Sequence, residues 1–371
     1  MSASSAIAGR TTEYGLYGST TGSAIADSTK ISQQLDTLTE QAGDGLVAQT
    51  FAGLGANAGT ALSLAPQVAS LQAWQNNITA ATSQMAVAQT TLSQISSIAS
   101  NFYAQVVNLN GLDPSEVDSI ASDAQSALQQ VANLLDSTDA GSYVFGGQDT
   151  ETPPVPDPDG ITSSGFYTQI QTAVAGLAGN GAAATTAATL AIASSNAAGT
   201  SPFSATLSQP AATLASLRTT IATGPGQQST VGILASANAT VTSTGSVTTG
   251  SYTRDVMCAL ATIGSLSSSQ INDAGFSTVV SSVYSSLGGA IGALNEDAGV
   301  MGDQQTALQT QATGFANAST ALQSQVSNVE DVDMAQTLSQ LTQTQTRLQE
   351  SYQLIAGLQS LTLSKFLPVP S

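Results

Sequence analysis

Histidine is absent from this sequence of 371 residues, and cysteine occurs only once, as Cys258. The lack of histidine excludes histidine-based zinc sites and Ser-His or Cys-His nucleophiles. A single cysteine excludes a disulfide within the chain, and its apolar helical surroundings, "RDVMCALATI", favour a small buried side chain. We therefore expect no enzymatic activity, no metal and no cofactor.

Charge is also scarce, because only 8% of the residues are charged, against about a quarter in a typical soluble domain. Six basic residues face 24 acidic ones, and no Lys or Arg occurs between Lys30 and Arg218. Nucleic acid and anionic membrane surfaces are therefore not expected partners. No apolar run is long enough to span a bilayer, and "MSASSAIAGRTTEYG" lacks the apolar core of a signal peptide. We expect a protein that is cytosolic or is secreted without a cleavable signal.

Aromatic residues make up only 5% of the chain, and alanine supplies much of its 41% apolar content. We therefore expect helices that meet along narrow seams. Apolar residues recur every seven positions over residues 64–109 and 280–329, with companion rows three or four positions further on, which predicts two long helices. The predicted rod core consists of Leu71, Trp74, Ile78, Met85, Leu92, Phe102, Leu294, Met301, Leu308, Phe315 and Leu322.

Two shorter apolar patterns lie near the chain ends. One begins at Ile25 and ends at the "GDG" breaker of residues 43–45, and the other begins at Met334 with a 4-3 spacing. Gln, Thr and Ser flank the second pattern, where coiled coils normally carry Glu and Lys. These stripes predict helices that pack against other helices. The predicted assembly interface consists of Ile31, Leu35, Leu38, Met334, Leu338, Leu341, Leu348, Tyr352, Ile355 and Leu358.

Helix-start signals occur at two further places. In "LDPSEVDSI", Asp113 can cap a helix, Pro114 suits its first turn, and Glu116 completes a capping box. The helix that follows should fold back antiparallel on the long helix before it. Asp333 and Gln336 form a similar start signal, so one helix should end near Val329 and another should follow.

The middle of the chain has a different texture. A short β-type run and a Pro/Asp-rich stretch are followed by helical pieces such as "LASLRTTIA" (214–222) and by strand-like residues 229–253. We interpret this region as a small α+β or β domain inserted into a long antiparallel helical rod, at the end away from the termini. The predicted divisions are 1–45 (N-terminal inner-core helix), 46–150 (first half of the rod), 151–253 (inserted outer domain), 254–330 (second half of the rod) and 331–371 (C-terminal inner-core helix).

Acidic residues offer one alternative interpretation. Asp157 and Asp159 could bind Ca²⁺, but they lack the ligand spacing of a twelve-residue calcium loop, and a solvated turn is the favoured interpretation. The adjacent acids at 296–297 and 330–331 diverge on helices, which suits capping or solvation better than paired-carboxylate catalysis.

Four features together resemble the bacterial flagellin and hook-filament junction protein family. They are the heptad helix at 64–110, "DAGSYVFGGQDTETPPV" (139–155), "NVEDVDMAQTLSQLT" (328–342) and the terminal "LQSLTLSKFL" (358–367). The second is similar to the family's Tyr-x-Phe-x-Gly-x-x-Thr-x-Thr-x-Pro hairpin, and the third to the acidic entry to its last helix. The resemblance covers both ends of the chain and little of its middle.

This resemblance implies a mainly α structural subunit of the extracellular flagellum, exported through the flagellar secretion apparatus and assembled through its terminal helices for motility. The implied partners are identical subunits in a helical filament, hook-associated and cap proteins, and an export chaperone. The alternative within the family is the hook-filament junction protein. A secreted adhesin is a remote alternative, because neither a signal peptide nor a β repeat of fixed period is found.

Overall fold

The computed structural model describes the backbone of residues 4–111 and 113–364, and the side chains of residues 22–109, 111 and 113–357. The described chain is mainly α-helical, with short strands only in its middle, which confirms the predicted fold class. It divides into two compact units. The terminal unit contains the described residues up to Ser70 and from Ala318 onward, and the central unit contains residues 71–317.

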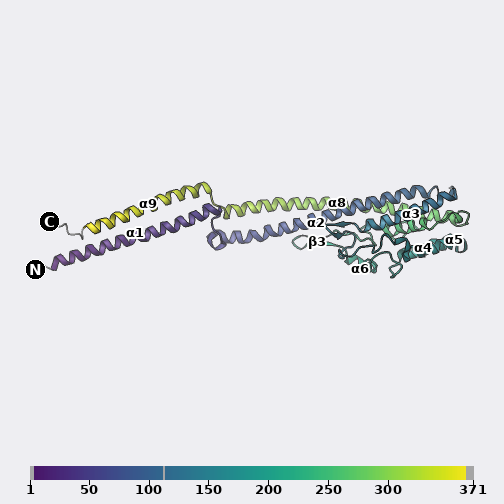
Figure 1. Ribbon diagram of the computed structural model, residues 1–371, viewed down its shortest axis with the longest axis horizontal. Coiled ribbons are helices and arrows are strands. Elements are labelled where there is room, and N and C mark those ends of the chain that lie inside the picture. Colours follow the sequence, from purple (N-terminus) through teal and green to yellow (C-terminus); the bar gives the residue numbers. More distant parts are fainter. Residues whose placement is uncertain (1–3, 112, 365–371) are drawn as a thin grey trace. The chain divides into compact units, whose positions relative to one another are not determined.

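The terminal unit is built on two helices, α1 (Ser4–Asp44) and α9 (Met334–Ser364), which lie side by side (Figure 1). It also holds the 3₁₀ helix η1 (Phe51–Asn57), the start of α2 (Ala58–Val106) and the end of α8 (Phe276–Glu330). α1 stops at Asp44 because Gly45 has a φ of 73°, a left-handed conformation that favours glycine. The break predicted at the "GDG" residues is therefore confirmed.

A side-chain cap starts α9. One carboxylate oxygen of Asp333 accepts hydrogen bonds from the backbone N–H groups of Ala335 at 3.0 Å and Gln336 at 3.1 Å. Such a cap satisfies donors in the first turn that have no partner inside the helix. The predicted helix break before Met334 and its capping residue are both confirmed.

In the central unit, α2 and α8 run antiparallel. The rings of Trp74 and Phe315 lie 5.6 Å apart, and further along, the side chain of Gln89 donates a hydrogen bond to the carbonyl of Ala298 at 3.2 Å. Apolar side chains from both helices are buried between these points, including Ile78 and Leu308. The two heptad patterns therefore form one long seam.

α3 (Pro114–Leu135) follows the 3₁₀ helix η2 (Leu109–Gly111) and folds back along α2, as the sequence predicts. At its start, the backbone N–H of Asp113 donates to the Glu116 carboxylate at 3.0 Å, which is the expected capping contact. Just beyond its end, the hydroxyl of Thr91 on α2 donates to that of Ser137 at 3.2 Å. Because the chain turns between α2 and α3, this contact shows that α3 runs back along α2 as far as the level of Thr91.

α7 (Tyr252–Gly264) is buried along its whole length and packs against α3, α4 (Gly165–Ala175) and α5 (Leu177–Ser194). Arg254 lies inside this core and donates hydrogen bonds to the carbonyls of Ser236 at 2.9 Å and Ala193 at 2.8 Å. Its guanidinium also lies 5.0 Å from the ring centre of Phe203. Burial is tolerated here because the donors have partners. Cys258 on the same helix is buried, as predicted.

The rest of the middle region contains two separate two-stranded antiparallel sheets. β1 (Thr138–Asp139) and β2 (Ser142–Tyr143) are joined by Ala140 and Gly141, whose φ angles of 49° and 85° suit a tight two-residue hairpin turn. The second pair is β3 (Thr220–Gly224) with β4 (Gln227–Thr230). Short helices occur at η3 (Ile161–Ser163), α6 (Ala211–Ser216) and η4 (Ser268–Gln270).

The secondary structure predicted for two segments of this region is wrong. "LASLRTTIA" is not one helix, because it divides between α6 and β3. Arg218 lies at the change, and its guanidinium donates to the carbonyls of Gly232 and Ala239, both at 2.9 Å. Residues 231–250, expected to be strand-like, are mostly irregular, and tertiary hydrogen bonds rather than a sheet ladder satisfy much of their backbone.

The inserted domain was expected at the end of the helical rod away from the termini, but part of it lies along the side of the rod. The β3–β4 hairpin packs against the side of α2 and α8, where Asn77 donates to the Ala222 carbonyl at 3.3 Å and Gln311 to the Thr223 carbonyl at 2.8 Å. These contacts lie far along both helices from the turn between α2 and α3. The inserted residues therefore extend along the flank of the helices and are not confined to their end.

Candidate assembly interface

The pair formed by α1 and α9 holds the residues predicted for assembly. On α1, Leu38 is buried, and Ile31 and Leu35 are half-buried, so the apolar stripe of this helix turns towards its partner. Ser28 continues the same 4-3 row and is also buried. Ile25 lies off this row and is exposed. All three predicted α1 residues thus occupy one seam.

The structure divides the predicted α9 residues into two groups. Leu341, Leu348 and Ile355 are half-buried. Met334, Leu338 and Tyr352 are exposed by 41%, 48% and 56% respectively. Leu358 lies outside the residues whose side chains are described. α1 therefore covers only one edge of a wider apolar stripe.

The covered edge contains hydroxyl side chains that the apolar pattern missed. Thr337 and Thr344 are buried and Ser351 is half-buried, and they alternate with Leu341 and Leu348 in a 4-3 row. Small side chains at a helix contact allow the axes to approach closely, since interaxial distance depends on the residues between them. The seven-residue spacing of these hydroxyl residues is visible in the sequence, and reading polar as well as apolar positions would have found them.

A short backbone clip joins the two helices where α1 ends and α9 begins. The N–H of Val47 donates to the carbonyl of Glu330 at 2.6 Å, and the N–H of Val332 donates to the carbonyl of Gly45 at 2.9 Å. Between these bonds, Leu46 and Asp331 form an antiparallel bridge. These bonds join segments more than 280 residues apart in the sequence, and they set the register in which α1 and α9 meet.

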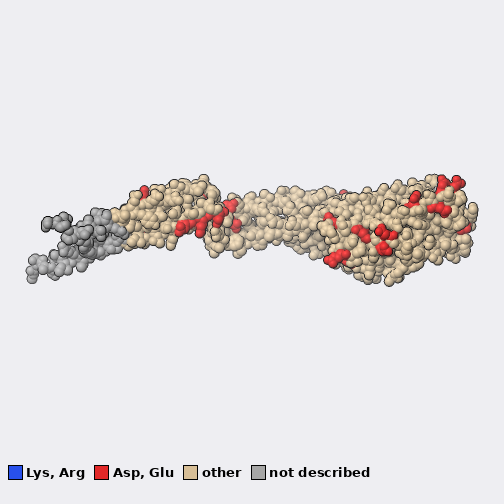
Figure 2. All heavy atoms as spheres, viewed as in Figure 1, with Lys and Arg blue, Asp and Glu red and all other residues tan. Residues whose placement is uncertain are grey.

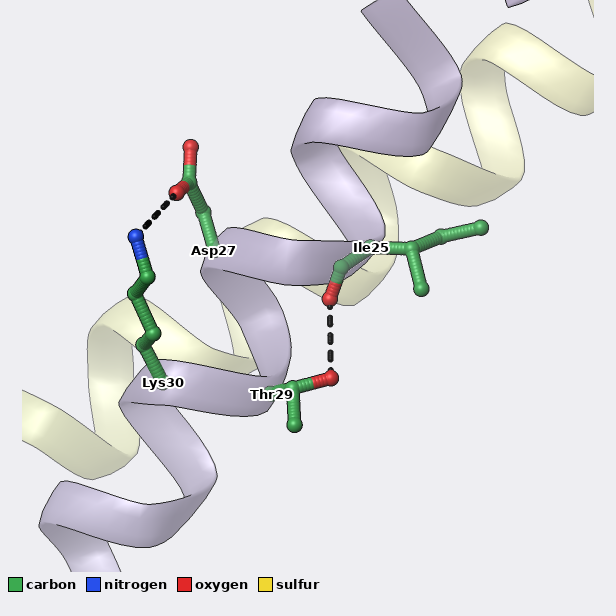
Figure 3. A network of polar contacts seen from close by, with 4 residues as sticks. All are labelled: Ile25, Asp27, Thr29 and Lys30. Atoms are coloured by element: carbon green, nitrogen blue, oxygen red, sulfur yellow. Dashed lines mark hydrogen bonds and ion pairs between the residues drawn. The ribbon is translucent and has the colours of Figure 1, made fainter.

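Charge contributes little to this pair. Lys30 and Asp27 lie 3.8 Å apart in an exposed ion pair on α1, and nearby the Thr29 hydroxyl donates to the Ile25 carbonyl within the helix (Figure 3). An exposed pair of this kind contributes about 0–1 kcal/mol at most. On the face drawn in Figure 2, acidic side chains are visible and no Lys or Arg of the described residues is. Apolar and hydroxyl contacts are therefore the main attraction between the helices.

The predicted rod-core residues all lie inside or at the edge of helix seams. Seven are buried, namely Ile78, Met85, Leu92, Phe102, Leu294, Met301 and Leu308. The other four, Leu71, Trp74, Phe315 and Leu322, are half-buried. The apolar side chains of the seam are thus most buried from Ile78 to the end of α2 and from the start of α8 to Leu308.

The acidic turn considered for calcium has protein partners. Asp157 accepts a hydrogen bond from the N–H of Gly160 at 3.0 Å, and Asp159 accepts one from the side chain of Asn133 at 3.2 Å. Over the described residues, no group of three or more His, Cys, Asp or Glu side chains is placed to hold a metal ion. Nor is any described helix long and apolar enough to cross a membrane.

Comparison with known families identifies both ends of the chain. Residues 19–150 match the bacterial flagellin N-terminal helical region, and residues 285–367 match the bacterial flagellin C-terminal helical region. The two matches together cover more than half of the chain. No curated protein matches it. The matched ranges include every residue predicted for the assembly interface and leave out the whole inserted segment, residues 151–253.

Proposed function

Since the chain belongs to the bacterial flagellin family, whose members are structural subunits of an extracellular filament, we propose that it is exported through the flagellar secretion apparatus and polymerises through α1 and α9 to serve motility. The proposed partners are further copies of this chain, together with hook-associated and cap proteins and an export chaperone.

The exposed apolar edge of α9 is the observation that supports assembly through this helix. Met334, Leu338 and Tyr352 are exposed to solvent. They form one edge of the apolar stripe of α9, and α1 covers only the opposite edge of that stripe. Fully burying a side chain of this size contributes about 1.5–3 kcal/mol. Because these three side chains are already about half covered, a neighbouring copy that buried this edge would gain about half of that contribution from each of them.

The shortage of charged residues on α9 supports a crowded environment for this helix. Arg347 and Glu350 are the only charged residues of α9, and both are exposed. Close packing of identical subunits would bring like charges together and remove their water, which is costly. Gln, Thr and Ser avoid that cost because they can pair with one another or face water.

Substitution of an exposed apolar residue separates assembly from folding. Leu338→Asp places a charge on the uncovered edge, and because Leu338 is half in water, the monomer should keep its helical content. Gln343→Asp is the matched control, since it adds the same charge at an exposed position about 140° around the helix. We expect the first variant to stay monomeric and the second to polymerise under the same conditions, as measured by sedimentation and electron microscopy.

Two outcomes would contradict parts of the proposal. Normal filaments from Leu338→Asp would show that the uncovered edge of α9 is not an assembly surface. A parent protein that stays monomeric, and adds only to preformed hook ends, would favour the junction protein over the filament subunit. Long filaments grown from purified protein without hook would support the filament subunit.

A further inference from the structure

Two tyrosine rings stack between the long helices of the central unit. Tyr103 on α2 and Tyr284 on α8 have ring centres 4.1 Å apart and ring planes inclined by only 18°. Both side chains are half-buried and pack against the core. The rings are therefore held face to face while small molecules in solution can still reach them.

The surroundings hold this pair in place. Gly288 lies one turn beyond Tyr284, and a Cβ added there would come within 3.2 Å of the Cε2 atom of Tyr103. The absence of a side chain at Gly288 thus leaves the space that the Tyr103 ring occupies. Hydrogen bonding to Tyr284 raises the pKa of Tyr103 above its ordinary value. No charged residue occurs on α2 or within residues 276–295 of α8.

Other oxidisable side chains of the described residues are less suited to react in pairs. The Cys258 thiol is buried, and burial raises its pKa to about 12, so it supplies almost no reactive thiolate. Tyr167 and Tyr252 are also buried, and their hydroxyls are hydrogen-bonded to the Gly264 carbonyl and the Asp297 carboxylate. Tyr352 is exposed on α9, and no ring contact joins it to another aromatic side chain of the described residues.

We propose that Tyr103 and Tyr284 form an oxidative cross-linking site, which one-electron oxidants such as a peroxide-driven peroxidase convert to dityrosine. Each phenol gives one electron and its hydroxyl proton to the oxidant and becomes a phenoxyl radical. The radicals couple through one carbon ortho to each oxygen, which is a Cε atom of each ring. The hydrogen on each coupled carbon then moves to the phenol oxygen, so the product has lost two hydrogen atoms in all.

The product would join α2 to α8 covalently. The two tyrosines belong to segments that are distant in the sequence and antiparallel in the central unit, so the bond closes a long loop of chain. A cross-link between such segments restricts the unfolded chain, as a disulfide does. Oxidised subunits should therefore unfold at a higher temperature and migrate faster than unmodified chains on a denaturing gel.

Photo-oxidation of dilute, unpolymerised protein with a ruthenium tris-bipyridyl complex and persulfate tests the proposal. We expect dityrosine fluorescence in the fast-migrating monomer band and one cross-linked peptide that contains residues 103 and 284, lighter by two hydrogen atoms. Tyr103→Phe and Tyr284→Phe keep both rings and should each abolish this product. Tyr143→Phe, the same change at another half-buried tyrosine, should leave it unchanged.

Gly288→Ala gives a second, independent readout because it keeps every tyrosine and only displaces the Tyr103 ring. We expect its cross-linking rate to fall several-fold. Monomer-band fluorescence that persists in both Phe variants, or an unchanged rate in Gly288→Ala, would overturn the assignment. Circular dichroism of each variant before oxidation shows that the helices are intact.

Discussion

The carboxylate of Asp297 on α8 accepts a hydrogen bond from the hydroxyl of Tyr252 on α7 at 2.9 Å, in the interior of the central unit. The same carboxylate accepts the backbone N–H groups of Ala239 at 2.9 Å and Thr240 at 3.0 Å. Burial raises the pKa of Tyr252, which keeps its hydroxyl a donor. One side chain on a long helix thus holds both α7 and an irregular loop of the inserted segment.

Asp297→Asn should destabilise the central unit because an amide has only one oxygen to offer these donors, and its own N–H₂ group would face them. Hydrogen bonds to a charged group contribute about 1.5–3 kcal/mol each, so we expect a loss of about 3 kcal/mol in the free energy of unfolding. Chemical denaturation measures this loss. Glu296→Gln, the same chemical change at the exposed neighbouring position, should alter stability by less than about 0.5 kcal/mol. Equal effects of the two changes would contradict the role given to Asp297.

The backbone clip between α1 and α9 provides a second prediction. Val332→Pro removes the N–H that donates to the Gly45 carbonyl, at a position that precedes the first residue of α9. We expect the pairing of the two helices to weaken by about 1 kcal/mol, the typical net contribution of one hydrogen bond. Hydrogen exchange in residues 24–44 should accelerate accordingly. Val332→Ala keeps the N–H and is the control, so equally fast exchange in both variants would show that the clip does not hold the helices together.

Asp136 provides a pH-dependent prediction. It lies at the C-terminal end of α3, where burial raises its pKa to about 6 while its carboxylate accepts the N–H of Val155 at 2.8 Å. The folded protein therefore binds this proton more tightly than the unfolded chain, whose aspartate has a pKa near 3.9. The contribution of this group to stability is complete below about pH 4 and is lost as the pH rises through about 6.

Asp136→Asn should remove this dependence and should raise the unfolding temperature at pH 7. An amide oxygen still accepts the Val155 N–H, and the charge unfavourable at a helix C-terminus is gone. Thermal unfolding of parent and variant at several pH values measures the difference. Asp123→Asn, at an exposed position within α3, is the control. A variant that is less stable than its parent at pH 7 would contradict the prediction.

The long helices were predictable because their signals are local and repeated. Six consecutive heptads in α2 predict an apolar seam, whichever helix packs against it. The caps at Asp113 and Asp333 depend only on residues within one helical turn. The glycine at position 45 ends α1 for an equally local reason. These features needed no knowledge of the tertiary structure.

The inserted segment was less predictable because distant groups determine its backbone. The acid pair at 296–297 was expected to suit capping or solvation, yet Asp297 is buried against a loop almost 60 residues earlier in the chain. Likewise, Arg218 lies between the end of α6 and the start of β3, and its guanidinium donates to the Gly232 and Ala239 carbonyls. No local pattern reveals which loop a carboxylate or guanidinium will meet.

By itself, therefore, the sequence determined the mainly helical fold, the end of α1, the start of α9 and the apolar stripe of α9, although it placed the start of α1 at Ile25 and the helix begins at Ser4. Only the tertiary structure decided which edge of that stripe α1 covers. Thr337 and Thr344 are buried in the pair, and Leu338 and Tyr352 remain in water. The reason is that periodicity specifies the direction of a stripe around one helix, whereas the partner's register, set here by the clip between residues 45–47 and 330–332, specifies which part of it is buried.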